Sequence, residues 1–237
     1  MSTHTSPRRS LILGFSVLLL LTVAFSLHRA IFPSPAINSN LAIAKIIDAP
    51  TDIPTPQAMG TQTIVLAGGC FWGTEAVFEQ LRGVSSVVSG FAGGSAATAN
   101  YDTVSGGNTG HAEAIQITYD PKQISFGQLL KIYFFVAHDP TQVNRQSPDN
   151  GTQYRSVIFF ANSEQQRVSQ AYIGKLDRSQ IFPQPIATQL VALAKFYPAE
   201  DYHQNFIDRH PNYPYVVIHD RPKIERLRQQ FPNLIKG

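Results

Sequence analysis

A single cysteine, Cys70, follows a pair of glycines and precedes two large aromatic residues, Phe71 and Trp72. It is the only thiol in 237 residues, and Trp72 is the only tryptophan. The thiolate form of cysteine is a nucleophile, so Cys70 is the first residue to consider for covalent chemistry. A lone cysteine is also often an inert buried residue, and composition alone leaves both interpretations open.

The residues on either side of Cys70 predict a strand followed by a helix. Residues 63–67 are apolar and rich in β-branched side chains, and residues 72–81 carry apolar side chains at helical spacing. Cys70 would then lie at a strand-to-helix turn, close to the helix N-terminus. The partial positive charge and free N–H groups of a helix start favour a thiolate, which favours the reactive interpretation.

A carboxylate within an alternating segment is the second candidate. Residues 111–119 alternate with period two, which places Glu113 on the same strand face as Ile115, Ile117 and Tyr119. A carboxylate on an apolar face loses hydration, so its pKa rises and it can act as an acid near neutral pH. Alternatively, Glu113 lies at the strand end and reaches past the core into water.

The rest of the body alternates predicted strands and helices without an internal repeat. A glycine-rich loop containing Tyr101 and a polar loop at 141–153 separate some of them. Capping pairs, Ser125 with Gln128 and Ser163 with Gln166, indicate two helix starts. Beyond the elements around Cys70 and Glu113, the predicted segments are strands at 84–91, 156–160 and 187–196, helices at 125–138 and 163–178, and helical segments near 200–209 and 222–230.

This order predicts an α+β fold. Split β-α-β and antiparallel segments with helices on one face favour a two-layer sandwich of a mixed, largely antiparallel sheet with helices. Within that class we expect a ferredoxin-like plait.

The N-terminal segment predicts export or membrane anchoring. Arg8 and Arg9 precede an uncharged apolar run at 11–27, and small residues occur at 42–44. We therefore expect a signal peptide or membrane anchor at 1–32, a Pro-rich linker at 33–61 and the catalytic domain at 62–237. Both forms of the leader put the domain on the non-cytoplasmic side, in the periplasm or its equivalent.

The charge of the chain argues against a nucleic-acid partner. The net charge is +3, but residues 1–44 hold three of the 19 basic side chains and no acidic one. The remaining residues therefore carry equal numbers of basic and acidic side chains. No basic surface is predicted on the body, and contact with a membrane is expected only through the N-terminal segment.

Two other classes of function compete with a redox enzyme. A cysteine hydrolase would pair Cys70 with His111 or His138, and a non-catalytic binding module would use Phe71 and Trp72 as an apolar slot. A metal site is not expected, because the chain lacks the paired cysteines that would complete a zinc deaminase motif around His111 and Glu113.

Several motifs of the body together resemble one enzyme family, peptide methionine sulfoxide reductase of the A type. They occur in order over about residues 62–234 and are Gly69-Cys-Phe-Trp-Gly-Thr-Glu75, Thr109-Gly-His-Ala-Glu113, His138-Asp-Pro140, Gly151-Thr-Gln-Tyr-Arg-Ser156 and Phe196-Tyr-Pro-Ala-Glu-Asp-Tyr-His-Gln204.

The resemblance implies a role for each polar residue of the site. Cys70 would attack the sulfoxide sulfur, and Glu113 would protonate the sulfoxide oxygen. Tyr101 and Tyr154 would hydrogen-bond that oxygen, and Asp149 would help to order the site. These roles are chemically coherent, because the thiolate attacks sulfur while an acid and hydrogen-bond donors stabilise the departing oxygen.

The resemblance also implies the substrates. Phe71 and Trp72 would form the apolar slot for the substrate methyl group. The substrates would be methionine-S-sulfoxide in oxidised proteins and as the free amino acid, reduced to methionine for protein repair. No bound cofactor and no metal are implied, and we expect a monomer.

The chain departs from many family members in its thiol count. Those members carry further cysteines, often near the C-terminus, which resolve the sulfenic acid of the nucleophile into a disulfide. With Cys70 alone, the sulfenic acid would need an external thiol reductant, either thioredoxin or glutathione with glutaredoxin.

Overall fold

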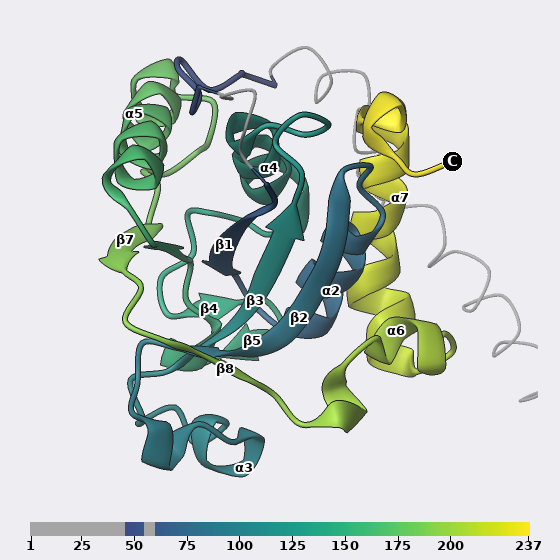
Figure 1. Ribbon diagram of the computed structural model, residues 1–237. Helices are drawn as coiled ribbons and strands as arrows, with labels where there is room; N and C mark the ends of the chain where they lie inside the picture. The colour runs from purple at the N-terminus through teal and green to yellow at the C-terminus, as the bar shows by residue number, and fades with distance from the viewer. Residues whose placement is uncertain (1–45, 55–59) are drawn as a thin grey trace, which may run out of the picture. The chain divides into compact units, whose positions relative to one another are not determined.

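A mixed sheet forms the centre of the computed structural model, which describes residues 46–54 and 60–237 (Figure 1). Its strand order is β7-β6-β1-β3-β2-β8, and every neighbouring pair is antiparallel except the parallel pair β6 and β7. The strands of this sheet are β1 (Gln62–Ala67), β2 (Val84–Ala92), β3 (Ala112–Tyr119), β6 (Val157–Phe160), β7 (Gln189–Ala192) and β8 (Phe196–Pro198). A separate short hairpin pairs β4 (Arg145–Gln146) with β5 (Asp149–Asn150).

The helices differ widely in length. The α-helices are α2 (Phe71–Glu79), α3 (Tyr101–Val104), α4 (Phe126–Ile132), α5 (Ser163–Ser179), α6 (Phe206–Arg209) and α7 (Arg221–Gln230). Short 3-10 segments are η2 (Ala96–Thr98), η4 (Thr152–Tyr154), η5 (Asp201–His203) and η7 (Pro232–Leu234), and π-helical segments are η3 (Tyr133–Ala137) and η6 (Val216–Asp220).

The alternation of the strands divides the core between the two faces of the sheet. On β3, Ile115, Ile117 and Tyr119 belong to the main core, together with residues of α2, α4, α5 and α7. Ala112 and Ala114, which flank Glu113 in the same strand, belong to a smaller cluster on the opposite face. Successive side chains of a strand point to opposite faces, so the period-two pattern of the sequence produces this division directly.

The predicted α+β class is confirmed. Strand β3 lies between β1 and β2, so β1, α2 and β2 form the split β-α-β unit that the sequence indicated. The ferredoxin-like plait stays a prediction, because β7 and β8 extend the sheet beyond four central strands.

Two predicted boundaries are wrong. The strand predicted at 187–196 is divided into two. Strand β7 pairs with β6 at one edge of the sheet, and the chain then crosses to the other edge, where β8 pairs with β2. The cap of α5 is Asn162 rather than Ser163, since the Asn162 side chain accepts a hydrogen bond from the Gln165 N–H at 2.9 Å. The predicted capping box of Ser125 and Gln128 at the start of α4 is present.

The predicted leader lies outside the described residues, and so does its apolar run at 11–27. No helix within residues 46–54 and 60–237 has the length and apolarity needed to cross a bilayer. Residues 46–54, in the predicted linker, contact the body: Asp52 accepts a hydrogen bond from the Gly127 N–H at 2.9 Å, and the Tyr172 hydroxyl donates to the Ile47 carbonyl. Export or anchoring and the non-cytoplasmic location stay predictions.

The cap of α5 can be tested by substitution. Replacing Asn162 with alanine leaves the Gln165 N–H without its side-chain acceptor, so Asn162→Ala should lower the free energy of unfolding by about 1 kcal/mol. Urea denaturation followed by circular dichroism measures this change. The matched variant Ser163→Ala should have a clearly smaller effect, and equal losses in the two variants would contradict the assigned cap.

Candidate active site

Cys70 lies at the turn between β1 and α2, as the sequence predicted. It is the N-cap residue of α2, and its side chain is 8% exposed. The two glycines before it allow other side chains to approach the backbone closely. A Cβ on Gly68 would lie 2.8 Å from the His138 ring, and one on Gly69 would lie 2.6 Å from Cγ of Gln146. Gly69 also has a φ of 88°, which disfavours other residues.

The thiol opens into a small cavity of about 210 Å³. All seven residues that the sequence analysis placed in the site line this cavity, together with Tyr213 and Tyr215, which it did not identify. The lining residues are Cys70, Phe71, Trp72, Tyr101, Glu113, Asp149, Tyr154, Tyr213 and Tyr215. A cluster of aromatic residues in Asn-Tyr-Pro-Tyr at 212–215 was the available signal for the two tyrosines.

Glu113 is buried beside the start of α2. Its side chain is 2% exposed, so the alternative that it reaches past the core into water is wrong. One carboxyl oxygen accepts a hydrogen bond from the Phe71 N–H at 3.1 Å. Burial raises the pKa of Glu113 to about 8, against the opposing effect of that hydrogen bond. Glu113 therefore carries a proton at neutral pH, as an acid requires.

The ionisation of Cys70 differs from the expectation based on its position. Burial raises the pKa of the Cys70 thiol well above its usual value, and the charges of Glu113 and Asp220 raise it further. The Trp72 N–H at the helix start and the Lys223 ammonium lower the Cys70 pKa, but by less. Desolvation outweighs the effect of the helix start, so the resting residue is a thiol.

Tyr101 and Tyr154 remain hydrogen-bond donors over the whole physiological pH range. Burial and the charge of Glu113 raise the pKa of Tyr101 to about 12 and also raise that of Tyr154. The Tyr154 carbonyl accepts a hydrogen bond from the Gly69 N–H at 3.2 Å, which ties its loop to the turn before Cys70. The Tyr215 hydroxyl donates a hydrogen bond to the Asp149 carboxylate.

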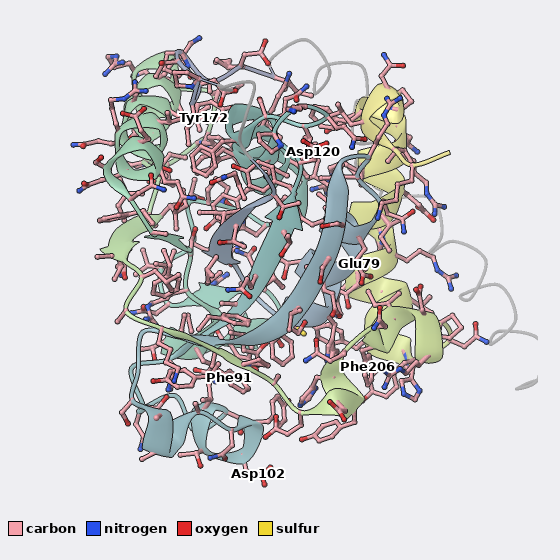
Figure 2. All side chains as sticks on the ribbon, in the orientation of Figure 1. Glu79, Phe91, Asp102, Asp120, Tyr172 and Phe206 are labelled. Carbon is pink, nitrogen blue, oxygen red and sulfur yellow. The ribbon has the colours of Figure 1, made fainter. Side chains whose placement is uncertain are left out.

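The two aromatic residues after Cys70 are held by residues far along the chain. The Trp72 ring stacks on Phe206, with centroids 3.7 Å apart and an angle of 7° between the planes. The Trp72 indole N–H donates to Nδ1 of His203 at 3.1 Å. The His203 ring lies 5.1 Å from the Phe71 ring, centroid to centroid. Phe91, a neighbour of Phe71, belongs to β2, and Phe206 belongs to α6. Figure 2 labels both residues near the lower end of the sheet.

The histidines that a cysteine hydrolase would need are engaged elsewhere. His111 contacts the Ser95 carbonyl through Nε2 at 2.9 Å, and neither His111 nor His138 lines the cavity. The His138 ring nitrogens lie 2.9 Å from the Tyr133 carbonyl and 2.7 Å from the Ser156 hydroxyl, and burial lowers the His138 pKa to about 4. These contacts disfavour a Cys-His pair. Within the described ranges, no group of three or more His, Cys, Asp or Glu side chains could hold a metal ion.

Comparison with known proteins agrees with this geometry. The family model described as "Peptide methionine sulfoxide reductase" matches residues 62–235. A reductase named MsrA 2 from Synechocystis is 58% identical over 180 residues, which cover 76% of this chain and 84% of the relative. An MsrA protein of Thermus thermophilus is 46% identical over 178 residues, or 75% of this chain and 99% of the relative.

Solved structures give the same result. The reduced form of Mxr1 from Saccharomyces cerevisiae superposes with a TM-score of 0.60 at 32% identity, covering 71% of this chain and 94% of that protein. Methionine sulfoxide reductase A of Corynebacterium diphtheriae superposes with a TM-score of 0.57 at 32% identity, covering 72% and 94%. The chain therefore belongs to the peptide methionine sulfoxide reductase family, A type, and is an oxidoreductase that reduces methionine sulfoxide.

Proposed function

We propose that the chain reduces methionine-S-sulfoxide, in oxidised proteins and as the free amino acid, with Cys70 as nucleophile and Glu113 as acid. The observation that carries this proposal is the presence of the Cys70 thiol and the buried Glu113 carboxyl in the same cavity of about 210 Å³. The choice of the S epimer rests on family membership, since each type of these reductases acts on one epimer.

In the first step, the Cys70 sulfur attacks the sulfoxide sulfur and Glu113 transfers its proton to the sulfoxide oxygen. Tyr101 and Tyr154 donate hydrogen bonds to that oxygen as negative charge develops on it. The S–O bond of the substrate breaks and an S–O bond to Cys70 forms, so the oxygen ends on Cys70 as a sulfenic acid. The proton that leaves the Cys70 thiol replaces the one that Glu113 gave, which returns Glu113 to its acid form. The sulfoxide gains two electrons and Cys70 loses two, so no bound redox cofactor is needed.

The walls of the cavity explain how the substrate is held. The methyl group of the sulfoxide fits between the Phe71 and Trp72 side chains, whose positions are fixed by the contacts with His203 and Phe206. The oxygen then faces the polar side of the cavity. Such an orientation aligns the sulfur with Cys70 and removes the reacting groups from water.

An external thiol completes the cycle. The sulfenic acid of Cys70 condenses with a thiol, which forms a mixed disulfide and releases water. A second thiol attacks this disulfide and returns Cys70 to the reduced form. Thioredoxin can supply both thiols, and glutathione with a glutaredoxin can do the same. Cys70 is the only cysteine of the chain, which is why we assign no internal disulfide.

The reaction class can be tested with racemic methionine sulfoxide and a dithiol, with the epimers separated afterwards. The full chain should consume only the S epimer. Cys70→Ser should abolish turnover, because a hydroxyl is a far poorer nucleophile for sulfur than a thiolate. Circular dichroism controls for folding of the variant. Consumption of both epimers, or turnover by folded Cys70→Ser protein, would exclude this mechanism.

The pH profile tests the role of Glu113. Reaction needs the acid form of Glu113, whose pKa is raised to about 8, and the thiolate of Cys70, whose pKa is raised well above its usual value. The value of kcat/KM should therefore stop rising near pH 8 and fall at alkaline pH, once the Cys70 thiol has also lost its proton. Glu113→Gln should lower the rate by about 100-fold or more and remove this alkaline limb. The exposed carboxylate of Glu164 provides the matched control, Glu164→Gln. If the fall in kcat/KM at alkaline pH persists unchanged in Glu113→Gln, a group other than Glu113 causes that fall.

The stoichiometry without reductant tests the external recycling. Reduced enzyme mixed with an excess of sulfoxide and no thiol should release one methionine per chain and then stop. Intact mass spectrometry should show one added oxygen, or one glutathione when that thiol is present. Release of two methionines per chain, or a mass loss of two hydrogens, would mean that the chain resolves its own sulfenic acid.

A further inference from the structure

A buried ion pair lies against the first turn of α2. The Lys223 ammonium is 3.2 Å from Oδ1 of Asp220, and the two residues come from α7 and from the end of η6. The Asp220 side chain is fully buried and the Lys223 side chain is 16% exposed. Within the part of the chain that the structure describes, Oδ2 of Asp220 has no hydrogen-bond partner. A buried carboxylate with an unsatisfied oxygen is costly, so its position requires an explanation.

Gly73 shows how closely this pair approaches the helix that begins at Cys70. A Cβ on Gly73 would lie 2.1 Å from Oδ1 of Asp220 and 2.8 Å from the Lys223 ammonium. Any side chain here would displace the ion pair. Gly73 is three residues after Cys70, so one helical turn brings its backbone near the thiol.

The local backbone leading to Asp220 is unusual as well. Segment η6 (Val216–Asp220) is π-helical and runs directly into α7. Isolated π-helical turns within helices occur frequently at functional sites. Here the π-helical turn places the Asp220 carboxylate in the interior, while the following turn of α7 brings Lys223 beside it.

The charges around the thiol come from several elements. Glu113 on β3 and Asp220 raise the Cys70 pKa, whereas Lys223 lowers it. Burial raises the pKa of Asp220, Lys223 and His219 on η6 lower it, and Asp149 on β5 raises it. The tyrosines Tyr101, Tyr154 and Tyr215 line the same cavity as Cys70.

We propose that Asp220 and Lys223 are positioning residues for the reaction, which set the ionisation of Cys70 from behind the first turn of α2. The Asp220 carboxylate adds to the desolvation and to the charge of Glu113 in keeping the resting thiol protonated, and it holds Lys223 in place. The Lys223 ammonium then supports the negative charge that the sulfur needs when it attacks the sulfoxide. This inference rests on the proposed role of Cys70 as the nucleophile.

Alkylation of Cys70 by iodoacetamide as a function of pH tests the pair without any sulfoxide turnover. Because the chain has one cysteine, the rate reports this thiol alone. Asp220→Asn removes a negative charge but keeps an acceptor for Lys223, so it should lower the apparent Cys70 pKa by about one unit. Alkylation at neutral pH should then be about tenfold faster.

A second substitution isolates the lysine. Adding Lys223→Met to Asp220→Asn should reverse the acceleration, whereas adding Lys223→Arg should retain most of it. Arg226→Met removes one charge from an exposed position of the same helix and should leave the profile unchanged. Repeating the series in a Glu113→Gln background removes the titration of Glu113 from the curves of alkylation rate against pH.

The outcomes are distinct from those that test the reductase activity. An unchanged alkylation profile in Asp220→Asn would overturn the proposal. So would identical profiles when Lys223→Met and Lys223→Arg are each combined with Asp220→Asn. Loss of stability without a shift in the profile would also overturn it, since a structural role alone predicts that result. Failure of sulfoxide turnover would refute the proposed function and leave the alkylation result standing.

Discussion

The hydrogen bond from the Phe71 N–H to the Glu113 carboxyl joins the two elements on which the cavity depends. It connects the first turn of α2 with the apolar face of β3, at a point that water does not reach. The same desolvation raises the pKa of both Glu113 and Cys70, so both groups hold their protons at neutral pH. In the proposed mechanism, the Glu113 proton is transferred to the oxygen of a bound sulfoxide as the Cys70 sulfur attacks.

The apolar side of the cavity depends on a different constraint. Trp72 follows Cys70 in sequence, but its ring is held by Phe206 and its indole N–H by His203, both of which belong to the C-terminal part of the chain. The proposed nucleophile and the proposed substrate slot are therefore assembled from segments that are distant in sequence. A rigid aromatic stack would suit the methyl group of the proposed substrate, because few rotamers need to be restricted on binding.

Local patterns predicted the elements of the site well. The period-two alternation placed Glu113 on the buried face of β3, and the strand-to-helix transition placed Cys70 at the N-cap of α2. Both signals depend on a few neighbouring residues. By contrast, the pKa of Cys70 depends on burial and on charged residues that are remote in sequence, such as Asp220. Its position at a helix start therefore did not predict its protonation state. Tyr215 was missed for the same reason, since only tertiary packing brings it to Asp149.

The crossing between β7 and β8 has a consequence for solubility. Strand β7 pairs with β6 and strand β8 pairs with β2, so a single stretch of the chain forms both edges of the sheet. An edge strand presents a row of unpaired backbone N–H and C=O groups, which is a template for pairing with another chain. Strand β8 has three residues, whereas β2 beside it has nine, so the row exposed at this edge is much shorter than the one that β2 would present.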